Sequence, residues 1–331
     1  MKIIRFIFGL FLTFCIIFSC FVGVKKINAK NPSLSAKEYQ GLITVWNVDC
    51  FEGGKGSRRQ FLLDVARTVE KNNVGVKIMV VSHTITSVEQ GLKEGDLPDV
   101  ISFGLGVEVE NLIPLHIDFP SNGGTIEDVR YAVPWCRGGY LLITKSDSGI
   151  DLYDNNFDNI IVSQGEYTQP LLAMTLEDIK AKDFSINQPL DAYVQFVSSK
   201  KSVFLGTQRD VVRLENRGLE VNTRPLTVYN DLYQYVALTS RDKNKLTMAK
   251  RFINQLLSKN VQSKLEQISM MSEIVDVNYD NQHLISMQKN KSFSTLSVFV
   301  STGTLKNCQE LSKEAVKGEQ TAINKLKKLL V

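Results

Sequence analysis

Two carboxylates stand close together near the start of the folded part, and such a pair is the first candidate for chemistry. Asp49 and Glu52 are three positions apart and precede a glycine-rich stretch. A carboxylate pair performs acid–base work in glycosidases. The sequence offers no further support for an enzyme, because it has no G-x-S-x-G elbow, no H-E-x-x-H pair and no Cys–His arrangement with telling spacing. We therefore expect a protein without catalytic residues, with a glycosidase-like enzyme as an alternative.

The glycine-rich stretch at residues 53–57 (GGKGS) is a second candidate. Free backbone N–H groups in a glycine turn that opens a helix bind anions, and Lys55, Arg58 and Arg59 add positive charge. The stretch is not a Walker A loop, because Gly56 stands where Ser or Thr would bind magnesium. Two interpretations remain open: a site for a phosphorylated or acidic ligand, or a turn whose basic side chains are solvated.

Cysteine and histidine predict neither a metal site nor a disulfide framework. Three of the five cysteines, Cys50, Cys136 and Cys308, follow the N-terminal segment, and an odd number argues against a disulfide scaffold. A Cys50–Cys136 bridge and buried free thiols are both open interpretations. The three histidines share no zinc-like spacing with each other or with the cysteines. We expect no metal and no cofactor.

The N-terminus has the pattern of an export signal. Residues 6–24 carry no charge and follow Lys2 and Arg5. Three interpretations remain open: an uncleaved membrane anchor, cleavage and acylation at Cys20 in a lipobox-like IFSC, or signal-peptidase cleavage after Ala29. In each of them residues 1–29 are a signal or anchor and 30–41 a tether. We expect the folded part outside the cytoplasm, held at the membrane or secreted.

The net charge of +4 belongs to that segment. Residues 1–29 hold Lys2, Arg5, Lys25 and Lys26 and no acidic residue, so the remaining chain is neutral overall. A general nucleic-acid-binding surface is disfavoured, because it needs clustered Lys and Arg on the folded part. A chain of 331 residues exceeds the size at which a single core stops growing, about 250–300 residues, so we expect two lobes.

Strands and helices alternate at the start of the folded part. Apolar spacing predicts strands at 42–48, 76–81 and 98–103 and helices at 57–69 and 86–94, with Ser57 and Gln60 forming a capping box. This βαβ series predicts a parallel sheet. The extended segments 131–136 and 140–144 flank Gly138 and Gly139, which is typical of a segment that crosses between lobes.

The remainder is predicted more coarsely. Residues 147–168 are polar and predicted irregular. Helical spacing is found at 176–182, 190–198, 210–215, 243–257, 261–268 and 305–330, the last interrupted at Gly318. Short β-rich stretches predict extended structure at 202–206 and 226–238.

Several of these segments resemble family 1 extracellular solute-binding proteins, the maltose-binding-protein-like receptors of ABC importers. The resemblance covers residues 42 to about 330 and is carried by segments 43–46 (ITVW), 49–59 (DCFEGGKGSRR), 97–103 (LPDVISF), 132–140 (AVPWCRGGY) and 205–210 (LGTQRD), and by the helix at 243–257. It implies an α/β, two-lobed, type II periplasmic-binding-protein-like fold. It places 42–134 with 225–297 in one lobe, and 135–224 with 298–331 in the other, which is shortened for the family.

The resemblance also implies a ligand cleft between the lobes, at the carboxyl ends of the strands. Aromatic faces stack on sugar rings there, and charged or amide groups bind the hydroxyls. The positions that match these roles are Trp46, Asp49, Phe51, Glu52, Trp135, Tyr140, Arg209 and Tyr233.

Most of these positions have an alternative structural role. The two tryptophans can pack in the core, Asp49 and Glu52 can cap the helix that follows them or line solvent, and Arg209 can pair with Asp210. Tyr233 belongs to a run of tyrosines that strand alternation divides between core and cleft.

We therefore expect a receptor that binds a small solute, a sugar or sugar derivative, and delivers it to an ABC importer permease. The short stretch between the predicted crossings, 137–224, raises an alternative. In it the chain is a degenerate, membrane-anchored receptor-like domain with an interaction or structural role.

Overall fold

The computed structural model describes residues 39–53, 55–117, 119, 123–199, 202–273, 277–289 and 294–330. The chain divides into a unit ending at Tyr39 and a compact unit from Gln40 to Val331. The predicted signal or anchor, with Cys15 and Cys20, lies outside the described residues. Within the described ranges, none of the helices combines the length and the apolar character needed to span a membrane.

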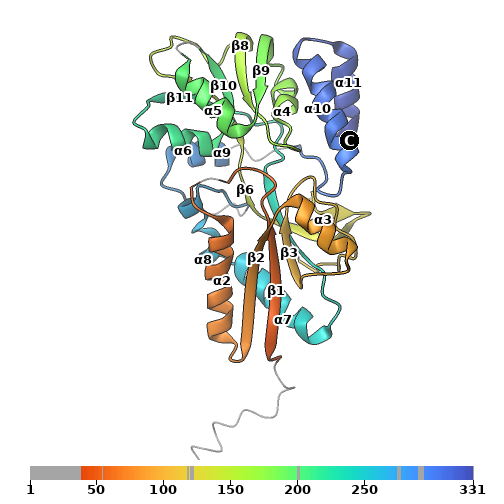
Figure 1. Cartoon of the computed structure of the whole chain (residues 1–331). Helices are drawn as coiled ribbons and strands as arrows, with labels where there is room; N and C mark the ends of the chain where they lie inside the picture. The colour runs from red at the N-terminus through yellow and green to blue at the C-terminus, as the bar shows by residue number, and fades with distance from the viewer. Residues whose placement is uncertain are drawn as a thin grey trace, which may run out of the picture. The chain divides into compact units, whose positions relative to one another are not determined.

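The first sheet contains five strands in the order β2-β1-β3-β12-β6 (Figure 1). Their bounds are β1 Gly41–Val48, β2 Val76–His83, β3 Val100–Phe103, β6 Ala132–Arg137 and β12 Tyr233–Leu238. β1 is parallel to β2 and β3, as the βαβ pattern predicts, and β12 pairs antiparallel with β3 and β6. The helices α2 Arg58–Asn72, α3 Ile85–Lys93 and α7 Lys243–Leu256 belong to this half of the unit.

The start of α2 is encoded locally. The Ser57 hydroxyl accepts a hydrogen bond from the Gln60 N–H at 3.4 Å, which satisfies one of the free donors of the first turn. The Gln60 side chain donates to Asp64 instead of completing the predicted capping box. The helix then buries one face, with Phe61, Leu62 and Val65 against the sheet.

The second sheet has the order β11-β7-β10-β8-β9. Its bounds are β7 Tyr140–Lys145, β8 Asn156–Ser163, β9 Lys180–Asn187, β10 Val203–Thr207 and β11 Val221–Pro225. The associated helices are α4 Pro170–Leu176, α5 Pro189–Ser198, α6 Gln208–Asn216, α9 Gln282–Lys289, α10 Thr302–Val316 and α11 Gln320–Leu329, with α10 packed on α4 (Figure 1). The remaining elements are the hairpin β4 Thr125–Ile126 and β5 Val129–Arg130, the helix α8 Lys259–Gln262 and the 3₁₀ turn Leu265–Ile268. The predicted α/β fold with two sheets flanked by helices is confirmed.

The chain passes from the first sheet to the second at Gly138 and Gly139, which separate β6 from β7. The Gly138 N–H donates to the Leu232 carbonyl at 2.7 Å, so two crossing segments run side by side. A Cβ on Gly138 would approach the Gln208 amide to 2.8 Å, and the side chain of Met287 abuts Gly139. At both positions glycine therefore leaves room for the end of a side chain from the second sheet's half to pack on the crossing.

Two stretches differ from the sequence-based prediction. Residues 147–168 were predicted irregular, but they contain β8, whose Ile160, Ile161 and Val162 are buried between β9 and β10. Residues 176–182 were predicted helical, but α4 ends at Leu176 and β9 begins at Lys180. Asp178 has a left-handed backbone with φ of 54°, which stops the helix, and pairing with β8 then imposes the extended form.

Two other predicted elements are shorter than expected. Within 226–238 only Tyr233–Leu238 forms a strand. The helix predicted at 261–268 is split into α8 and the 3₁₀ turn, which ends at the left-handed Ser269 with φ of 51°.

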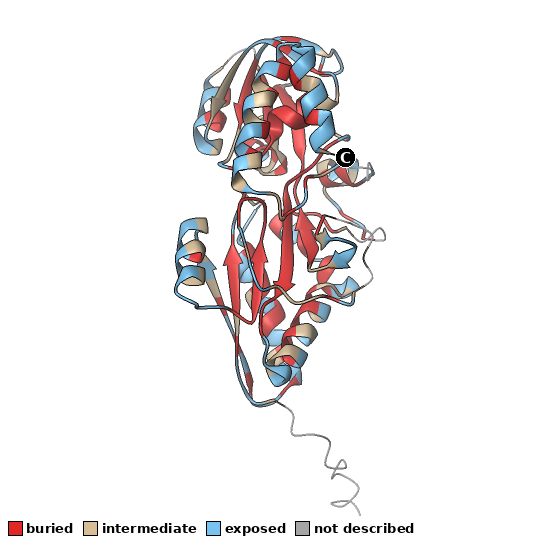
Figure 2. Cartoon of the chain, turned by 90° about the vertical axis from the view of Figure 1, so that its right-hand side faces the viewer, coloured by how far each residue is buried: buried red, intermediate tan, exposed pale blue. Residues whose placement is uncertain are grey.

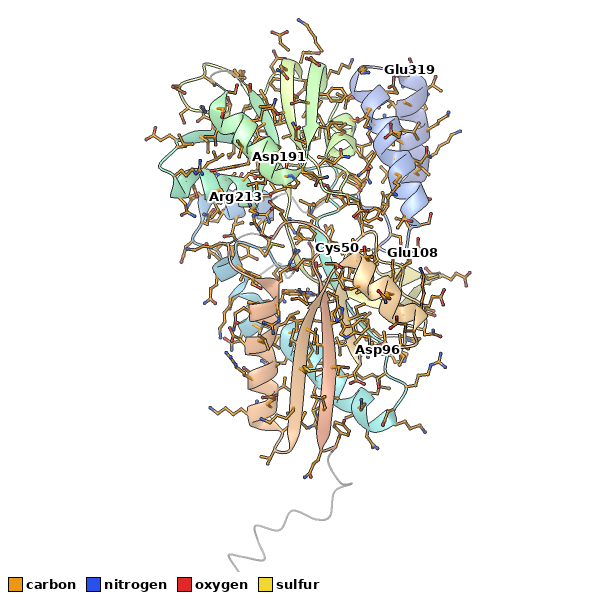
Figure 3. The ribbon with its side chains drawn as sticks, in the orientation of Figure 1. Cys50, Asp96, Glu108, Asp191, Arg213 and Glu319 are labelled. Atoms are coloured by element: carbon orange, nitrogen blue, oxygen red, sulfur yellow. The ribbon has the colours of Figure 1, made fainter. Side chains whose placement is uncertain are left out.

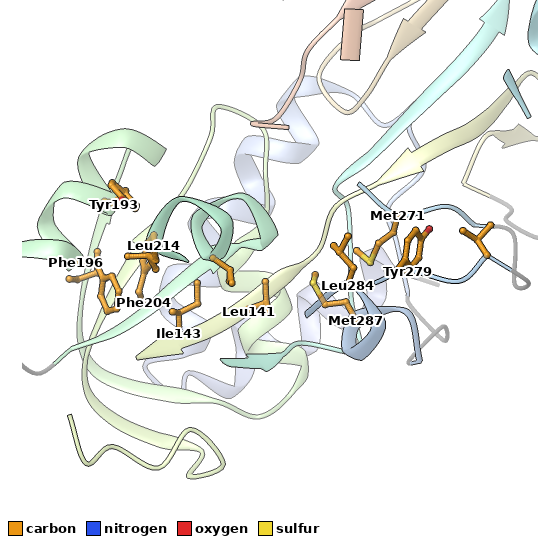
Figure 4. Packing of buried hydrophobic residues seen from close by; sticks show 14 residues of the cluster. Leu141, Ile143, Tyr193, Phe196, Phe204, Leu214, Met271, Tyr279, Leu284 and Met287 are labelled. Carbon is orange, nitrogen blue, oxygen red and sulfur yellow. The ribbon is translucent and has the colours of Figure 1, made fainter. Parts of the chain in front are cut away.

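Each sheet has its own apolar core (Figure 2). In the core of the second sheet, Ile143, Phe204 and Phe196 pack together with residues from 271–287, including Met271 and Met287 (Figure 4). These methionines lie within the range that the sequence assigns to the first lobe. The division of the chain between lobes stays a prediction. Its weakest part is 271–287, which the sequence assigns to the first lobe but which packs on the second sheet.

Candidate functional site

A cavity of about 500 Å³ lies between the loop after β1 and the loops of the second sheet. The first-sheet side contributes residues 49–53 and Arg58. The loop 49–53 follows the carboxyl end of β1, which is where ligands bind in open α/β sheets. The second-sheet side contributes Gly165, Gln188, Pro189, Leu190 and Arg209. We call this cavity the cleft.

Arg58 organises the first-sheet wall of the cleft. Its side chain is only 3% exposed and comes from the first turn of α2. Its Nε lies 2.8 Å from Asp49 Oδ1, Nη1 donates to Gln234 Oε1 at 3.2 Å, and Nη2 donates to the Phe51 carbonyl. The guanidinium also lies over the Phe51 ring, 4.3 Å from its centroid. One buried cation therefore fixes both the loop backbone and the Asp49 carboxylate.

Asp49 presents a carboxylate oxygen to the cleft. Its Oδ1 accepts from Asn47 Nδ2 at 3.1 Å in addition to the contact with Arg58. Within the part of the chain that the structure describes, its Oδ2 has no hydrogen-bond partner, and the side chain is 48% exposed. The carboxylate is thus oriented through one oxygen and free to accept through the other.

Glu52 links the two walls of the cleft. Its carboxylate accepts from Arg213 Nη1 at 3.0 Å and Nη2 at 3.3 Å, and lies 3.3 Å from Arg209 Nε. Arg209 Nη1 also donates to the Gly53 carbonyl at 3.3 Å. Arg209 thus pairs with Glu52 across the cleft. Asp210 instead accepts from the Thr207 N–H at the start of α6, and burial raises its pKa to about 6.

The two tryptophans lie in the core. Trp135 is fully buried, stacks on Phe61 at 5.7 Å between ring centroids, and donates from Nε1 to Ser102 Oγ at 3.0 Å. Trp46 is 6% exposed and lies between the His83 ring and Gly91 of α3. Both match the core-packing alternative, and neither lines the cleft.

The two tyrosines lie where the chain crosses between sheets. Tyr140 is buried and donates from its hydroxyl to Asp231 Oδ1 at 2.6 Å, while the Gln169 N–H donates to Asp231 Oδ2 at 2.9 Å. Burial raises the pKa of Asp231 to about 7 and also raises the pKa of Tyr140. Tyr233 is 5% exposed and packs against Tyr235 in the first core.

The structure therefore brings together Asp49, Phe51, Glu52 and Arg209 at the cleft. Their roles as ligand contacts stay predictions. Sequence reasoning missed Arg213 and Gln188. The first stands four positions after Arg209 on the same face of α6, a signal that could have been read. The second precedes Pro189 at the start of α5, and its side chain makes no capping hydrogen bond.

Two open questions from the sequence concern a Cys50–Cys136 bridge and an anion site at residues 53–57. Cys50, Cys136 and Cys308 are free thiols, so the bridge is absent. Cys50 Sγ accepts from the Gly104 N–H at 3.1 Å, and burial raises the pKa of its thiol to about 12. Lys55 and Arg59 are exposed. Gly54 lies outside the described residues, so the anion site stays a prediction.

No protein-family model matches this chain. No curated protein matches it. Among solved structures it is similar to the sugar-binding protein MalE from Xanthomonas citri, with a TM-score of 0.63 and 14% identity over 88% of this chain and 96% of that one. It is also similar to the GacH receptor of Streptomyces glaucescens (TM-score 0.61, 12% identity, 88% and 99%). A third similar structure is an extracellular solute-binding protein from Staphylococcus aureus (TM-score 0.58, 12% identity, 89% and 98%).

These likenesses show the fold of the chain, which is that of two-lobed, periplasmic-binding-protein-like proteins. Below we call each sheet, together with the helices packed on it, a lobe.

Proposed function

We propose that this chain is a family 1 solute-binding receptor of an ABC importer and that it binds a carbohydrate in the cleft. The observation that carries the proposal is the half-exposed Asp49 carboxylate, held by Arg58 through one oxygen and free at the other, in a two-lobed fold. The similar GacH and Staphylococcus aureus structures were solved in complex with acarbose and with maltose, respectively. Those ligands support a sugar as the class of solute.

Asp49 suits a hydroxyl donor for physical reasons. A charged acceptor makes hydrogen bonds about twice as strong as a neutral one. Its orientation is already fixed by Arg58 and Asn47, so little side-chain freedom is lost when a ligand binds. From the other lobe, the Gln188 amide and the Arg209 guanidinium face the same cavity.

Binding would couple to movement of the lobes. A ligand that contacts Asp49 on one side and Gln188 or Arg209 on the other stabilises the arrangement in which both sides reach it. An importer can recognise that arrangement. The corresponding partners are the importer permease and, through the N-terminal segment, the membrane, with the receptor on its outer face. No catalytic step is part of this proposal.

Calorimetry tests the proposal directly. Purified protein is titrated with glucose, maltose, maltotetraose and glucose 6-phosphate. We expect heat with at least one sugar, and a loss of affinity of about tenfold in Asp49→Ala, the equivalent of one charged hydrogen bond. Asp64→Ala, on the exposed face of α2, is the matched control and should bind as the wild type does. Absence of heat with every sugar, or equal affinity in Asp49→Ala, would contradict it.

One observation favours a second candidate. Four of the aromatic residues predicted for stacking lie in the core or at the crossing, and Phe51, the aromatic residue in the cleft lining, has its ring under Arg58. A receptor-like domain with an interaction or structural role would have such a cleft. A glycosidase-like enzyme has less support, because both Asp49 and Glu52 are paired with arginines.

A further inference from the structure

The cleft continues inward, toward the crossing between the lobes, as a small pocket. This pocket has a volume of about 20 Å³ and shares the loop residues Phe51 and Glu52 and the helix residue Pro189 with the cleft. Leu232, at the crossing, also lines it. A site needs roughly 10–15 Å³ to hold one water molecule, so this one takes a single oxygen-sized group. We call it the inner pocket.

The inner pocket lies at the carboxyl ends of two parallel strands of the second sheet. β8 ends at Ser163 and β10 ends at Thr207, and both residues line the pocket. Figure 3 shows Cys50, which lines the cleft, with Asp191 of α5 and Arg213 of α6 on its second-lobe side. Ligands bind at the carboxyl ends of strands in open α/β sheets. The second sheet therefore presents its own ligand edge here, facing the loop after β1.

Three of the hydroxyl groups at the inner pocket are bound within the fold. The Tyr140 hydroxyl donates to a carboxylate at the crossing at 2.6 Å. Thr168 Oγ1 accepts from the Gly165 N–H at 2.8 Å. Thr207 Oγ1 donates to Asp210 Oδ2 at 3.2 Å, in the turn that starts α6. These three hydroxyls hold the walls of the pocket in place.

Ser163 carries a hydroxyl that the fold does not use. The residue is 5% exposed and lines the inner pocket. Among the residues that the structure describes, none donates to or accepts from its Oγ. The large majority of buried side-chain polar atoms have a hydrogen-bond partner, and a buried group without one costs free energy. A ligand group in the inner pocket would supply that bond.

The other walls suit an uncharged carbon–oxygen group. Phe51, Pro189 and Leu232 offer apolar surface to the carbon. The Glu52 carboxylate is already bonded to two arginines of α6, so it needs no further charged partner. A hydroxyl both donates and accepts, as the Ser163 hydroxyl does, and it brings no charge into the pocket.

We infer that the inner pocket binds one hydroxyl group of the ligand and that Ser163 is a specificity-determining residue for it. The inference rests on the proposed function, which places a sugar in the cleft. The carbon that bears the hydroxyl contacts the apolar walls, and the rest of the sugar lies in the open cleft, where Asp49 is available to a second hydroxyl. A site built to bond a hydroxyl discriminates against an analogue without it, because its own polar group then stays unpaired. The inner pocket therefore selects which hydroxyl the ligand must carry and leaves the length of the ligand open.

Urea denaturation of the ligand-free protein tests whether the fold uses the Ser163 hydroxyl. We expect Ser163→Ala to keep or raise the midpoint of unfolding, because it removes an unpaired buried hydroxyl. Thr207→Val, which removes a bonded hydroxyl from the same pocket, should lower the midpoint. A lowered midpoint in Ser163→Ala would mean that the fold bonds this hydroxyl itself, and would overturn the inference.

Calorimetry tests the contact with the ligand. The probes are glucose, maltose and maltotetraose, with monodeoxy analogues of the first two. We expect Ser163→Ala to bind the parent sugar about tenfold more weakly than the wild type. One monodeoxy analogue should lose the same factor in the wild type and no further factor in Ser163→Ala. Ser146→Ala, an exposed serine beyond the far end of β7, is the control and should bind as the wild type does.

The outcomes separate this inference from the proposed function. Sugar binding that weakens in Asp49→Ala but not in Ser163→Ala would overturn the inference and leave the proposed function standing. A loss with each monodeoxy analogue that is repeated in full in Ser163→Ala would do the same, since the two groups then do not contact each other. Absence of heat with every sugar would overturn both, whatever the urea midpoints.

Discussion

Two aspartates in different regions of the molecule are held in different ways. Asp231, at the crossing between lobes, is 4% exposed, and both of its oxygens accept hydrogen bonds, from Tyr140 and from the Gln169 N–H. Asp49, at the cleft, has a side chain that is 48% exposed and one oxygen that is occupied. Both oxygens of Asp231 are therefore occupied, whereas Asp49 has one oxygen open to solvent.

The contrast extends to the charges around them. Burial raises the pKa of Asp231 to about 7, so near pH 7 about half of these carboxyls carry a proton. Asp49 stands beside the buried Arg58, and its free oxygen reaches solvent. At the crossing both oxygens of Asp231 are bonded and the carboxyl titrates near neutral pH, whereas at the cleft one oxygen of Asp49 stays open to solvent. Four changes test this division, given from the largest expected effect to the smallest.

Arg58→Ala should have the largest effect on stability. It leaves the Phe51 carbonyl and Gln234 without their donor and removes the cation beside Asp49. Because two buried acceptors lose their donor, at about 1–3 kcal/mol each, we expect a loss of about 4 kcal/mol. Urea denaturation measures the free energy of unfolding, and Arg59→Ala, its exposed neighbour, is the control. A loss below 1 kcal/mol would mean that the cleft wall is not organised by this residue.

Asp231→Ala should cost somewhat less. It leaves two buried donors, the Tyr140 hydroxyl and the Gln169 N–H, without their acceptor. At about 1–3 kcal/mol for each unsatisfied group, offset by the gain from no longer burying a carboxyl, we expect a loss of about 3 kcal/mol. Asp147→Ala, in an exposed turn, should leave the free energy of unfolding unchanged. Equal losses in the two variants would remove the distinction between crossing and surface.

The pH dependence of stability should show the titration of Asp231. Its pKa is raised to about 7 in the folded protein, against about 3.9 in an unfolded chain. Between these values the folded state binds more protons, so the free energy of unfolding falls as pH rises. From about pH 5 to pH 7 the wild type should lose about 2 kcal/mol more than Asp231→Asn, which cannot titrate there. Parallel pH profiles in urea denaturation would contradict a raised pKa at Asp231.

Trp135→Phe should have the smallest effect on stability and none on binding. It removes the indole hydrogen bond to Ser102 Oγ and a little buried surface, a loss of about 1 kcal/mol. Because Trp135 is fully buried, the affinity for a sugar should not change, although Asp49→Ala should weaken it. A tenfold loss of affinity in Trp135→Phe would mean that the ligand contacts the core, which would contradict the division between a structural core and an exposed cleft.

The sequence predicted the polar part of the cleft better than its aromatic part. Arg209 was a candidate because its segment resembles the family, and Asp49 and Glu52 because ligands bind at the carboxyl ends of strands. Trp46 was a candidate for the same reason, but helices cover both faces of β1, so its ring packs against α3 instead. Position along the chain is encoded locally, while the direction of a ring depends on what packs around it.

The missed elements have a similar cause. β8 begins with the polar residues Asn156 and Asp158, and it becomes a strand because it pairs with β9 and β10. Arg213 is visible as a helix residue, but its bond to Glu52 depends on how the lobes meet. Such partners are distant in sequence, and no local pattern records them. The predicted roles of the cleft residues and the division of lobes stay predictions for the same reason.

The position of β12 has a consequence for how this chain is made. β12 lies between β3 and β6 in the first sheet, yet every strand of the second sheet precedes it in the sequence. A growing chain therefore holds β3 and β6 with open edges until residues 233–238 arrive, and open strand edges pair with other chains. Folding that waits for such distant contacts is slow. A chain interrupted before β12 would have all five strands of the second sheet but neither the first sheet's inner strand β12 nor the part of the second core that residues 271–287 supply, and we expect it to aggregate.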